Sequence, residues 1–302
     1  MMPSNEFNTF KEVKLTAGTI RYQDVGKGMP IVFVHGLLVN GNLWRKVVPQ
    51  LAPHFRCIVP DLPLGSHQYP MHPNAELTPP ALARLIAEFI AALDLNEITL
   101  VGNDTGGALC QLVIAQHVER ISRLVLTNCD AFENFLPPFF RPLQWAAHIP
   151  GFTFVLAQAL RLRWLRTSPL ALGWLVKYPV DSTIIESYVR PLIAKAGVRH
   201  DVTKVLKGIS SRYTLEAAAK FGNFWRPVLL AWAEEDRFFT MSYAQRLRSS
   251  FPNAQLQPIP DSATFVAEDQ PEVLAQLIKA FIGDTEEMSI PITDGNDGVR
   301  LA

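Results

Sequence analysis

The sequence predicts an α/β protein in which a mostly parallel sheet is covered by helices, with one long helical insertion. Short apolar and β-branched runs alternate with segments of helical periodicity along most of the 302-residue chain. This alternation stops once, between about residues 133 and 222. Hydrophobic residues make up 48% of the chain and charged residues 19%, so the chain can bury one substantial core.

The predicted strands are short apolar runs bounded by turn residues. Val13–Leu15 and Thr19–Tyr22 are expected to form an antiparallel hairpin that turns at Ala17 and Gly18. The runs expected as parallel strands are Ile31–Val34, Cys57–Val59, Ile98–Val101, Leu124–Thr127, Val228–Ala231 and Leu256–Ile259.

The predicted helices carry apolar residues at a spacing of three to four. In Pro79–Leu93, one face carries Leu82, Leu85, Ile86 and Phe89. The other helices expected around the sheet are Gly106–His117, Ser242–Phe251 and Glu272–Ile282.

The region where the alternation stops is expected to be an inserted helical lid over residues 133–221. It contains Trp145, Trp164 and Trp174, and its apolar residues must pack against the sheet or line a pocket beneath it. The core is then formed by residues 1–132 and 222–283, and the polar residues 284–302 are expected to be a flexible tail.

Charge and cysteine content exclude several classes of protein. Lys plus Arg equals Asp plus Glu at 28 each, with no basic stripe, so we expect no nucleic-acid partner. Cys57, Cys110 and Cys129 are widely spaced, which indicates neither disulfides nor a metal site. They are expected to be small buried residues in a reducing compartment.

No membrane partner is expected either. The N-terminal residues lack the apolar run of a signal peptide, and the most apolar long stretch, Phe152–Val176, is interrupted by Arg161, Arg163 and Arg166. We therefore predict a soluble, cytoplasmic protein with a small-molecule substrate, and leave open whether it is a monomer or a homodimer.

The stretch from Thr99 to Ala108 carries the strongest functional signal. A strand enters, the turn Gly102-Asn103-Asp104-Thr105-Gly106 follows, and a helix leaves. This is the pattern of a nucleophile elbow, G-x-S-x-G, with Asp104 in place of Ser. The turn lifts one side chain above the sheet and directs a helix N-terminus toward it.

Two further motifs follow strands in the expected order. His35-Gly36-Leu37 comes directly after Ile31–Val34, and Asp61-Leu62-Pro63-Leu64-Gly65 comes after Cys57–Val59. With these motifs the chain resembles the α/β hydrolases, specifically the branch of haloalkane dehalogenases, fluoroacetate dehalogenases and epoxide hydrolases, which reads G-[HN]-D-x-G at the elbow. The resemblance covers roughly residues 10–283.

The resemblance implies an oxyanion hole formed by the Leu37 and Thr105 N–H groups, in a turn where His35 is expected to be structural. A carboxylate such as Asp104 attacks a saturated carbon or opens an epoxide without a base and forms an alkyl-enzyme ester. Water activated by His then hydrolyses the ester, and an acid orients the His. Asp236, after Val228–Ala231, matches the usual acid position; Asp130, after Leu124–Thr127, matches an alternative one.

The chain departs from the family where the His should stand. The local pattern Ser262-Ala263-Thr264-Phe265, followed by Glu268-Asp269-Gln270-Pro271, matches on both sides, but Thr264 occupies the His position. Threonine does not titrate near neutral pH, so it cannot serve as the general base. Other histidines available as replacements are His35, His67, His72, His148 and His200.

Substrate markers of the family are also missing. Haloalkane dehalogenases usually have Trp after the nucleophile and fluoroacetate dehalogenases usually have Arg, whereas this chain has Thr105. Leu37 stands where the former often have Asn. Epoxide hydrolases use lid tyrosines, for which Tyr178, Tyr188 and Tyr213 are available.

The leading hypothesis is a small-molecule hydrolase that acts through Asp104 on an epoxide or haloalkane, with no cofactor or metal. The alternative is a non-hydrolytic pocket protein, either a ligand binder or a lyase- or isomerase-like enzyme, that has lost the catalytic His. The intact elbow favours the first hypothesis and Thr264 favours the second.

Overall fold

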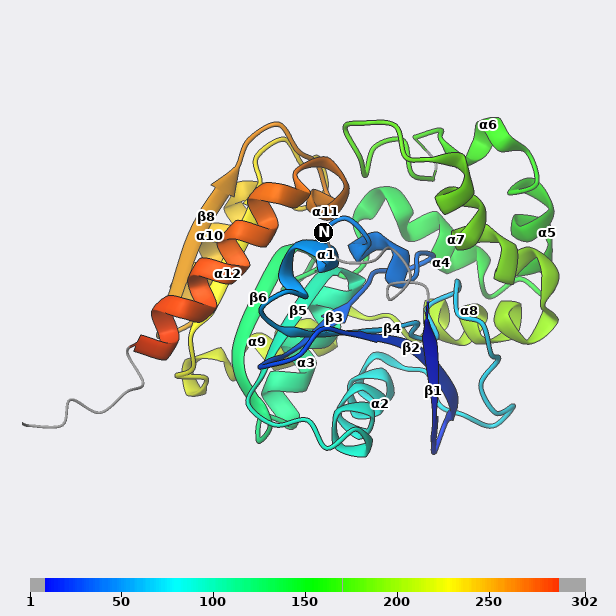
Figure 1. Cartoon of the computed structure of the whole chain (residues 1–302). Coiled ribbons are helices and arrows are strands. Elements are labelled where there is room, and N and C mark those ends of the chain that lie inside the picture. Colours follow the sequence, from blue (N-terminus) through cyan, green and yellow to red (C-terminus); the bar gives the residue numbers. More distant parts are fainter. Residues whose placement is uncertain (1–8, 170, 288–302) are drawn as a thin grey trace, which may run out of the picture.

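The computed structural model describes residues 9–169 and 171–287, which form one eight-stranded sheet in the order β1-β2-β4-β3-β5-β6-β7-β8 (Figure 1). The hairpin of β1 (Phe10–Leu15) and β2 (Gly18–Val25) joins the sheet antiparallel to β4 (Arg56–Pro60). All other strand pairs are parallel. The predicted fold class is confirmed.

The strands are longer than the apolar runs that predicted them. The parallel strands besides β4 are β3 (Pro30–Val34), β5 (Ile98–Asp104), β6 (Ile121–Cys129), β7 (Val228–Ala233) and β8 (Ala254–Ile259). In particular, β5 continues through Gly102 and Asn103 to Asp104, which pairs with Cys129 of β6. The strand therefore carries Asp104 to the carboxyl edge of the sheet.

The register of the parallel strands divides the apolar side chains between two cores. Val32, Leu100, Leu124 and Val228 are neighbours across the sheet and belong to one core. The next row, Phe33, Val101, Val125 and Leu229, belongs to the other core. Because side chains alternate along a strand, continuous apolar runs of this kind place the strands between two layers of helices.

Each face of the sheet is covered by its own helices (Figure 1). One face packs against α2 (Pro79–Ala92), α3 (Thr105–Gln116) and α10 (Met241–Ser250). The other packs against η2 (Gly41–Trp44), α1 (Val48–Leu51) and α12 (Pro271–Glu287). The last helix ends at Glu287, beyond the predicted Ile282, so the first residues of the predicted flexible tail are helical. The rest of that tail, 288–302, lies outside the described residues.

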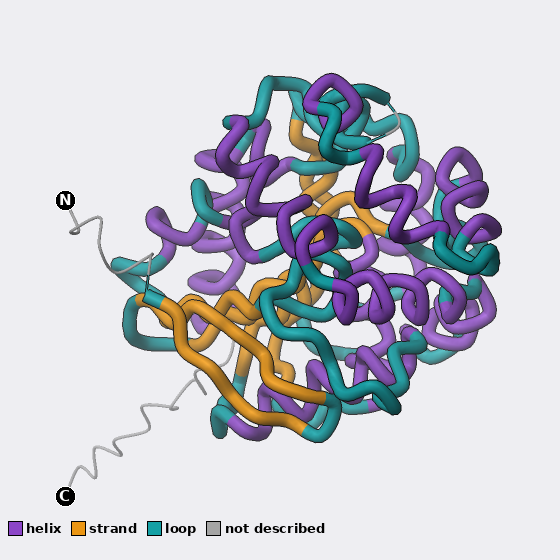
Figure 2. Tube along the Cα trace, turned by 90° about the vertical axis from the view of Figure 1, so that its right-hand side faces the viewer, coloured by secondary structure: helices purple, strands orange, loops and turns teal. Residues whose placement is uncertain are grey.

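The chain between β6 and β7, which we call the inserted segment (residues 133–221), contains helices and no strand among its described residues. Its helices between residues 141 and 208 gather on one side of the molecule in Figure 1, whereas the helix at 211–218 packs against α3. In Figure 2 helices and loops occupy most of that side. Its role as a lid stays a prediction. The elements are η3 (Pro138–Phe140), α4 (Arg141–Ala146), α5 (Phe152–Ala159), α6 (Arg163–Arg166), α7 (Ser182–Ala194), α8 (Ala196–Gly208) and α9 (Ser211–Ala218); η4 (Phe221–Asn223) follows.

Over the described ranges, none of the helices has both the length and the hydropathy needed to cross a bilayer. The same ranges contain no cluster of His, Cys, Asp and Glu arranged to hold a metal ion.

Candidate active site

Asp104 occupies a strained backbone conformation at the junction of β5 and α3. Its φ is +52° and its ψ is −133°, a combination that non-glycine residues rarely adopt. Such strain costs of order 1–3 kcal/mol and persists only where the surrounding structure enforces it. The side chain is buried, with 9% of its surface exposed. The chain thus holds one carboxyl group at a sharp turn above the sheet.

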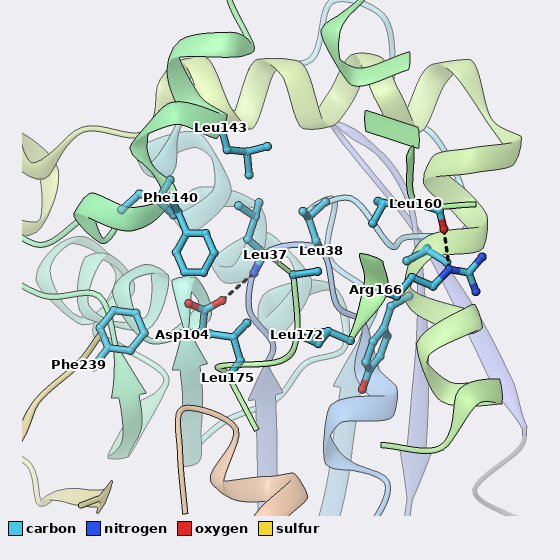
Figure 3. A pocket seen from close by; sticks show the side chains of 14 residues that line it. Leu37, Leu38, Asp104, Phe140, Leu143, Leu160, Arg166, Leu172, Leu175 and Phe239 are labelled. Atoms are coloured by element: carbon cyan, nitrogen blue, oxygen red, sulfur yellow. Dashed lines mark hydrogen bonds between the residues drawn. The ribbon is translucent and has the colours of Figure 1, made fainter. Parts of the chain in front are cut away.

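Two glycines allow the backbone to approach this carboxyl closely. The Leu37 N–H donates to Asp104 Oδ2 over 3.1 Å (Figure 3). A Cβ atom on Gly36 would lie 2.1 Å from the same oxygen, so any side chain at Gly36 would displace Asp104. A Cβ on Gly106 would lie 2.4 Å from the carbonyl oxygens of Val34 and His35. Glycine is therefore needed at both positions for the turn after β3 to meet the start of α3.

Burial raises the pKa of Asp104 to about 7, although hydrogen bonds from the Thr105 and Leu37 N–H groups lower it and the nearby Asp236 raises it further. A carboxyl that titrates near neutral pH is ionised in a large fraction of molecules under ordinary conditions. The two N–H donors are those predicted for the oxyanion hole. Both groups donate to the Asp104 carboxyl in this structure.

Asp130 lies close to Asp104 and Thr105 and is fully buried. The Thr105 hydroxyl donates to Asp130 Oδ2 over 3.3 Å, and Oδ1 has no hydrogen-bond partner among the described residues. Burial and the negative charge of Asp104 raise the pKa of Asp130 well above its usual range. We infer that Asp130 holds its proton when Asp104 is ionised, because two neighbouring buried carboxylates repel each other.

Asp236 approaches the site from the loop after β7. Its Oδ1 accepts hydrogen bonds from the N–H groups of Phe238 (2.7 Å) and Phe239 (3.1 Å). Burial raises the pKa of Asp236, and the side chains of Thr264 and Asn128 lie close enough to lower it in part. Asp236 Oδ2 and the Thr264 hydroxyl nevertheless make no hydrogen bond within the described chain. Asp236 therefore lies close to Thr264, as the sequence predicted for the acid at the usual position.

The loop that carries Thr264 is tied to the inserted segment. The Asp269 carboxylate accepts N–H groups of Ala263, Lys177 and Tyr178 over 2.9–3.2 Å. In addition, the Phe265 N–H donates to the Leu175 carbonyl over 2.8 Å. These bonds hold the Thr264 loop and residues 175–178 together at the rim of the site.

None of the histidines named from the sequence lines the pocket around Asp104. His35 Nε2 accepts the Leu62 N–H over 2.9 Å, which leaves Nδ1 to donate to the Gly36 carbonyl. His67 is buried between the Gly65 N–H and the Asp201 carboxylate. The remaining three, His72, His148 and His200, are exposed. In the described chain, therefore, no imidazole stands ready to activate water at Asp104.

The tyrosines named from the sequence differ in whether their hydroxyls are engaged. Tyr178 donates to Asp261, and Tyr213 accepts from Arg212. Tyr188 lines the pocket, and its buried hydroxyl makes no hydrogen bond within the described residues. Burial, and after it the negative charge of Glu268, raises the pKa of the Tyr188 phenol. Tyr188 is therefore the one of these three whose hydroxyl is left without a partner at the pocket.

The pocket above Asp104 is almost wholly apolar (Figure 3). Its walls come from the turns after β3 and β7 and from the inserted segment. Besides Asp104, only Arg166 and Tyr188 carry polar groups, and Arg166 donates through Nε to the Leu160 carbonyl. The apolar lining residues are Leu37, Leu38, Leu136, Phe140, Leu143, Leu160, Ala171, Leu172, Leu175, Val189 and Phe239.

The family model that describes the alpha/beta hydrolase fold matches residues 29–167, from the strand before the oxyanion turn into the inserted segment. The chain has the α/β-hydrolase fold. Among curated relatives, the chain is 27% identical to haloalkane dehalogenase 2 of Mycobacterium tuberculosis, over 86% of this chain and 90% of the relative. It is 29% identical to a cis-3-alkyl-4-alkyloxetan-2-one decarboxylase of Shewanella oneidensis, over 90% of this chain and 88% of the relative.

Solved structures of this superfamily share the fold. A haloalkane dehalogenase of Agrobacterium tumefaciens superimposes with a TM-score of 0.76 at 22% identity, over 91% of this chain and 96% of the other. An esterase of Thermogutta terrifontis superimposes with a TM-score of 0.70 at 21% identity, over 91% of this chain and 98% of the other. Proteins with this fold therefore catalyse different reactions, and the reaction has to be inferred from the residues of the site.

Apart from Asp104, Leu37 and Tyr188, the sequence did not single out the residues that line the pocket. A pocket beneath the inserted segment was expected, but its lining includes Leu38 and Phe239 from loops of the core. The apolar run Phe152–Val176 was the available signal, and it contributes Leu160, Leu172 and Leu175. The packing of several short helices decides which of its residues face the pocket. The spacing of apolar residues along the sequence does not reveal that packing.

Gly36→Ala tests the close approach to Asp104. The new methyl group would overlap Oδ2, so we expect the free energy of unfolding to fall by about 1–3 kcal/mol. Thermal denaturation would measure the loss. Gly222→Ala is the matched control, because a Cβ there meets nothing within 4 Å. Equal stability of both variants would contradict the geometry.

Proposed function

We propose that this α/β hydrolase forms an alkyl-enzyme ester on Asp104 with an apolar epoxide- or haloalkane-type substrate. The observation that carries the proposal is the placement of one carboxylate, strained and held by two backbone N–H groups, at the base of an apolar pocket. An ionised carboxylate needs no base to displace a leaving group from a saturated carbon. The apolar walls favour a substrate with alkyl groups, because burying them releases ordered water.

In this proposal, Asp104 Oδ1 or Oδ2 bonds to the substrate carbon while the bond to the leaving group breaks. The other carboxyl oxygen becomes the ester carbonyl and stays near the Leu37 and Thr105 N–H groups. Attack of water on that carbonyl would place negative charge on the oxygen that these groups bind. The protonation states of Asp236 and Asp130 would set the negative charge around Asp104. Thr264 would occupy the position of the His without accepting a proton.

The second half of the reaction lacks its usual base, which leads to a specific expectation. General-base help contributes about 10² to 10⁴-fold, so the Asp104 ester of a simple alkyl group should persist. After incubation with bromohexane or epoxyhexane, peptide mass spectrometry should find the added mass on Asp104. Thr264→His should speed release of the adduct if Asp236 can orient the new ring, whereas Thr264→Val should not.

Asp104→Asn is the negative control for labelling. Rapid turnover of the wild-type protein without any adduct would show that another group acts as the base. Failure of every reagent to label Asp104, together with unchanged function of Asp104→Asn, would overturn the nucleophile and leave a binding protein.

The pH dependence of labelling tests the ionisation of Asp104. Only the carboxylate attacks, so the labelling rate should rise from about pH 5 and level off above about pH 8. The midpoint should lie near 7, where burial places the pKa of Asp104. Asp236→Asn removes a negative neighbour and should move the midpoint to lower pH. A rate independent of pH over this range would contradict the assignment.

A second candidate function follows from the missing base. A dialkyl oxetan-2-one is a four-membered lactone, and the Shewanella relative is named for its decarboxylation. Attack of Asp104 on the ring carbon that bears oxygen would break that C–O bond and free the lactone carboxylate. The carbon–carbon bond to that carboxylate then breaks, and carbon dioxide leaves. The electron pair of the broken bond forms the alkene, and the C–O bond to Asp104 breaks at the same time. This cycle returns Asp104 without water or a base.

The two candidates predict different products from a cis-dialkyl oxetan-2-one. Decarboxylation would give an alkene and carbon dioxide without a lasting adduct, and Thr264→Val would leave the rate within about twofold because no proton moves. Hydrolysis would instead give a β-hydroxy acid, which gas chromatography with mass spectrometry distinguishes from the alkene. Asp104→Asn should abolish either product. Formation of only the hydroxy acid would exclude the decarboxylase candidate.

A further inference from the structure

The inserted segment presents large apolar side chains to solvent. Between residues 145 and 164, six of them are 50–68% exposed, which defines an outer apolar patch: Trp145, Ile149, Phe154, Val155, Leu162 and Trp164. They come from the consecutive elements α4, α5 and α6 and the turns between them. Exposed apolar groups that are this large and this close in the chain indicate a partner surface, because isolated exposed residues are the norm on soluble proteins.

The same part of the chain has an unusual charge. The protein as a whole carries as many acidic as basic residues, yet no Asp or Glu occurs between Glu133 and Asp181. Within this interval, Arg166 forms an ion pair with Glu186. Lys177 forms ion pairs with Glu235 and Asp261. The other basic side chains are exposed and make no ion pair within the described part of the chain: Arg141, Arg161 and Arg163.

We propose that α4, α5 and α6 dock on a lipid surface that contains anionic headgroups. Tryptophan and aliphatic side chains enter the boundary between headgroups and acyl chains, while nearby arginines bind the negative surface. A second copy of this chain fits less well, because a symmetric contact would bring the unpaired arginines of both copies together. An acidic protein partner would satisfy the arginines but would leave the six apolar side chains without an equivalent apolar layer.

The position of the pocket supports a lipid surface over other partners. Leu143 of α4, Leu160 after α5 and Arg166 of α6 line the pocket (Figure 3), and exposed neighbours of these residues in the same part of the chain form the patch. A lipid surface on the patch would therefore lie against the elements that form one wall of the pocket. The lipid contact itself does not depend on the chemistry proposed for Asp104.

The proposal changes one expectation drawn from the sequence. Arg161, Arg163 and Arg166 interrupt Phe152–Val176, which argued against a membrane-spanning segment and led us to expect no membrane partner. Short helices that carry arginines between apolar residues are instead suited to lie in the plane of the interface. The contact proposed here is peripheral and requires no spanning helix.

Sedimentation with vesicles tests the proposal on the full chain. The wild-type protein should bind phosphatidylcholine vesicles that contain phosphatidylglycerol, and bind pure phosphatidylcholine vesicles at least about fivefold more weakly. The combined variant Trp145→Ser, Phe154→Ser and Trp164→Ser should bind the anionic vesicles at least about tenfold more weakly. Arg161→Gln with Arg163→Gln should weaken binding and reduce its dependence on salt.

Two control variants distinguish binding through the patch from non-specific adsorption of exposed apolar residues and from the proposed chemistry at Asp104. Trp225 is 73% exposed but precedes β7, at the amino ends of the parallel strands, so Trp225→Ser should bind vesicles like the wild type. Asp104→Asn should also bind like the wild type, so failure of the proposed chemistry would not affect this result. Thermal denaturation would verify that each variant folds.

Several outcomes would overturn the proposal. They are equal binding to neutral and anionic vesicles, unchanged binding of the triple variant, or an equal loss in Trp225→Ser. Analytical ultracentrifugation adds another: a wild-type dimer that the triple variant converts to a monomer, without vesicle binding, would assign the patch to self-association.

Discussion

The hydrogen bond from the Leu37 N–H to Asp104 Oδ2 is the contact on which the geometry of the site depends. It requires β3 and β5 to be neighbours in the sheet, Gly36 to lack a side chain and Asp104 to accept a positive φ. The positive φ of Asp104 costs free energy in strain, and the burial of its carboxyl costs free energy in desolvation. The three conditions are compatible only because the parallel sheet brings the turn after β3 and the start of α3 to one edge.

The site then gathers three buried carboxyl groups, Asp104, Asp130 and Asp236, around that contact. Backbone N–H groups of Leu37, Thr105, Phe238 and Phe239 partly offset their burial. Thr264 supplies only a hydroxyl beside this cluster and adds no positive charge. Burial raises the pKa of Asp236 and, more strongly, that of Asp130, where the negative charge of Asp104 raises it further.

Much of this arrangement could be predicted from the sequence, because the fold places its motifs at strand ends. The apolar runs identified every strand, and G-x-D-x-G located Asp104. The extension of β5 to Asp104 was missed because Gly102 and Asn103 have low strand propensity, and pairing with β6 holds them in the strand. The direction of the His and Tyr side chains could not be predicted either. His35 accepts the Leu62 N–H and Tyr178 donates to Asp261, and both contacts join residues distant in sequence.

Thr264, at the position where the resemblance implies a His, separates the two halves of the proposed reaction. Forming an ester on Asp104 needs an ionised carboxylate and a pocket that accepts an alkyl group, and the residues around Asp104 fit both needs. Hydrolysing that ester needs a group that takes a proton from water, and the pocket lining offers no imidazole. A lactone whose ring has been opened carries a carboxylate whose loss as carbon dioxide supplies the electron pair that releases Asp104, so for such a substrate the second need disappears. The missing imidazole therefore bears on the two proposed functions differently: it slows the release of a simple alkyl ester and leaves the decarboxylation of an opened lactone unaffected.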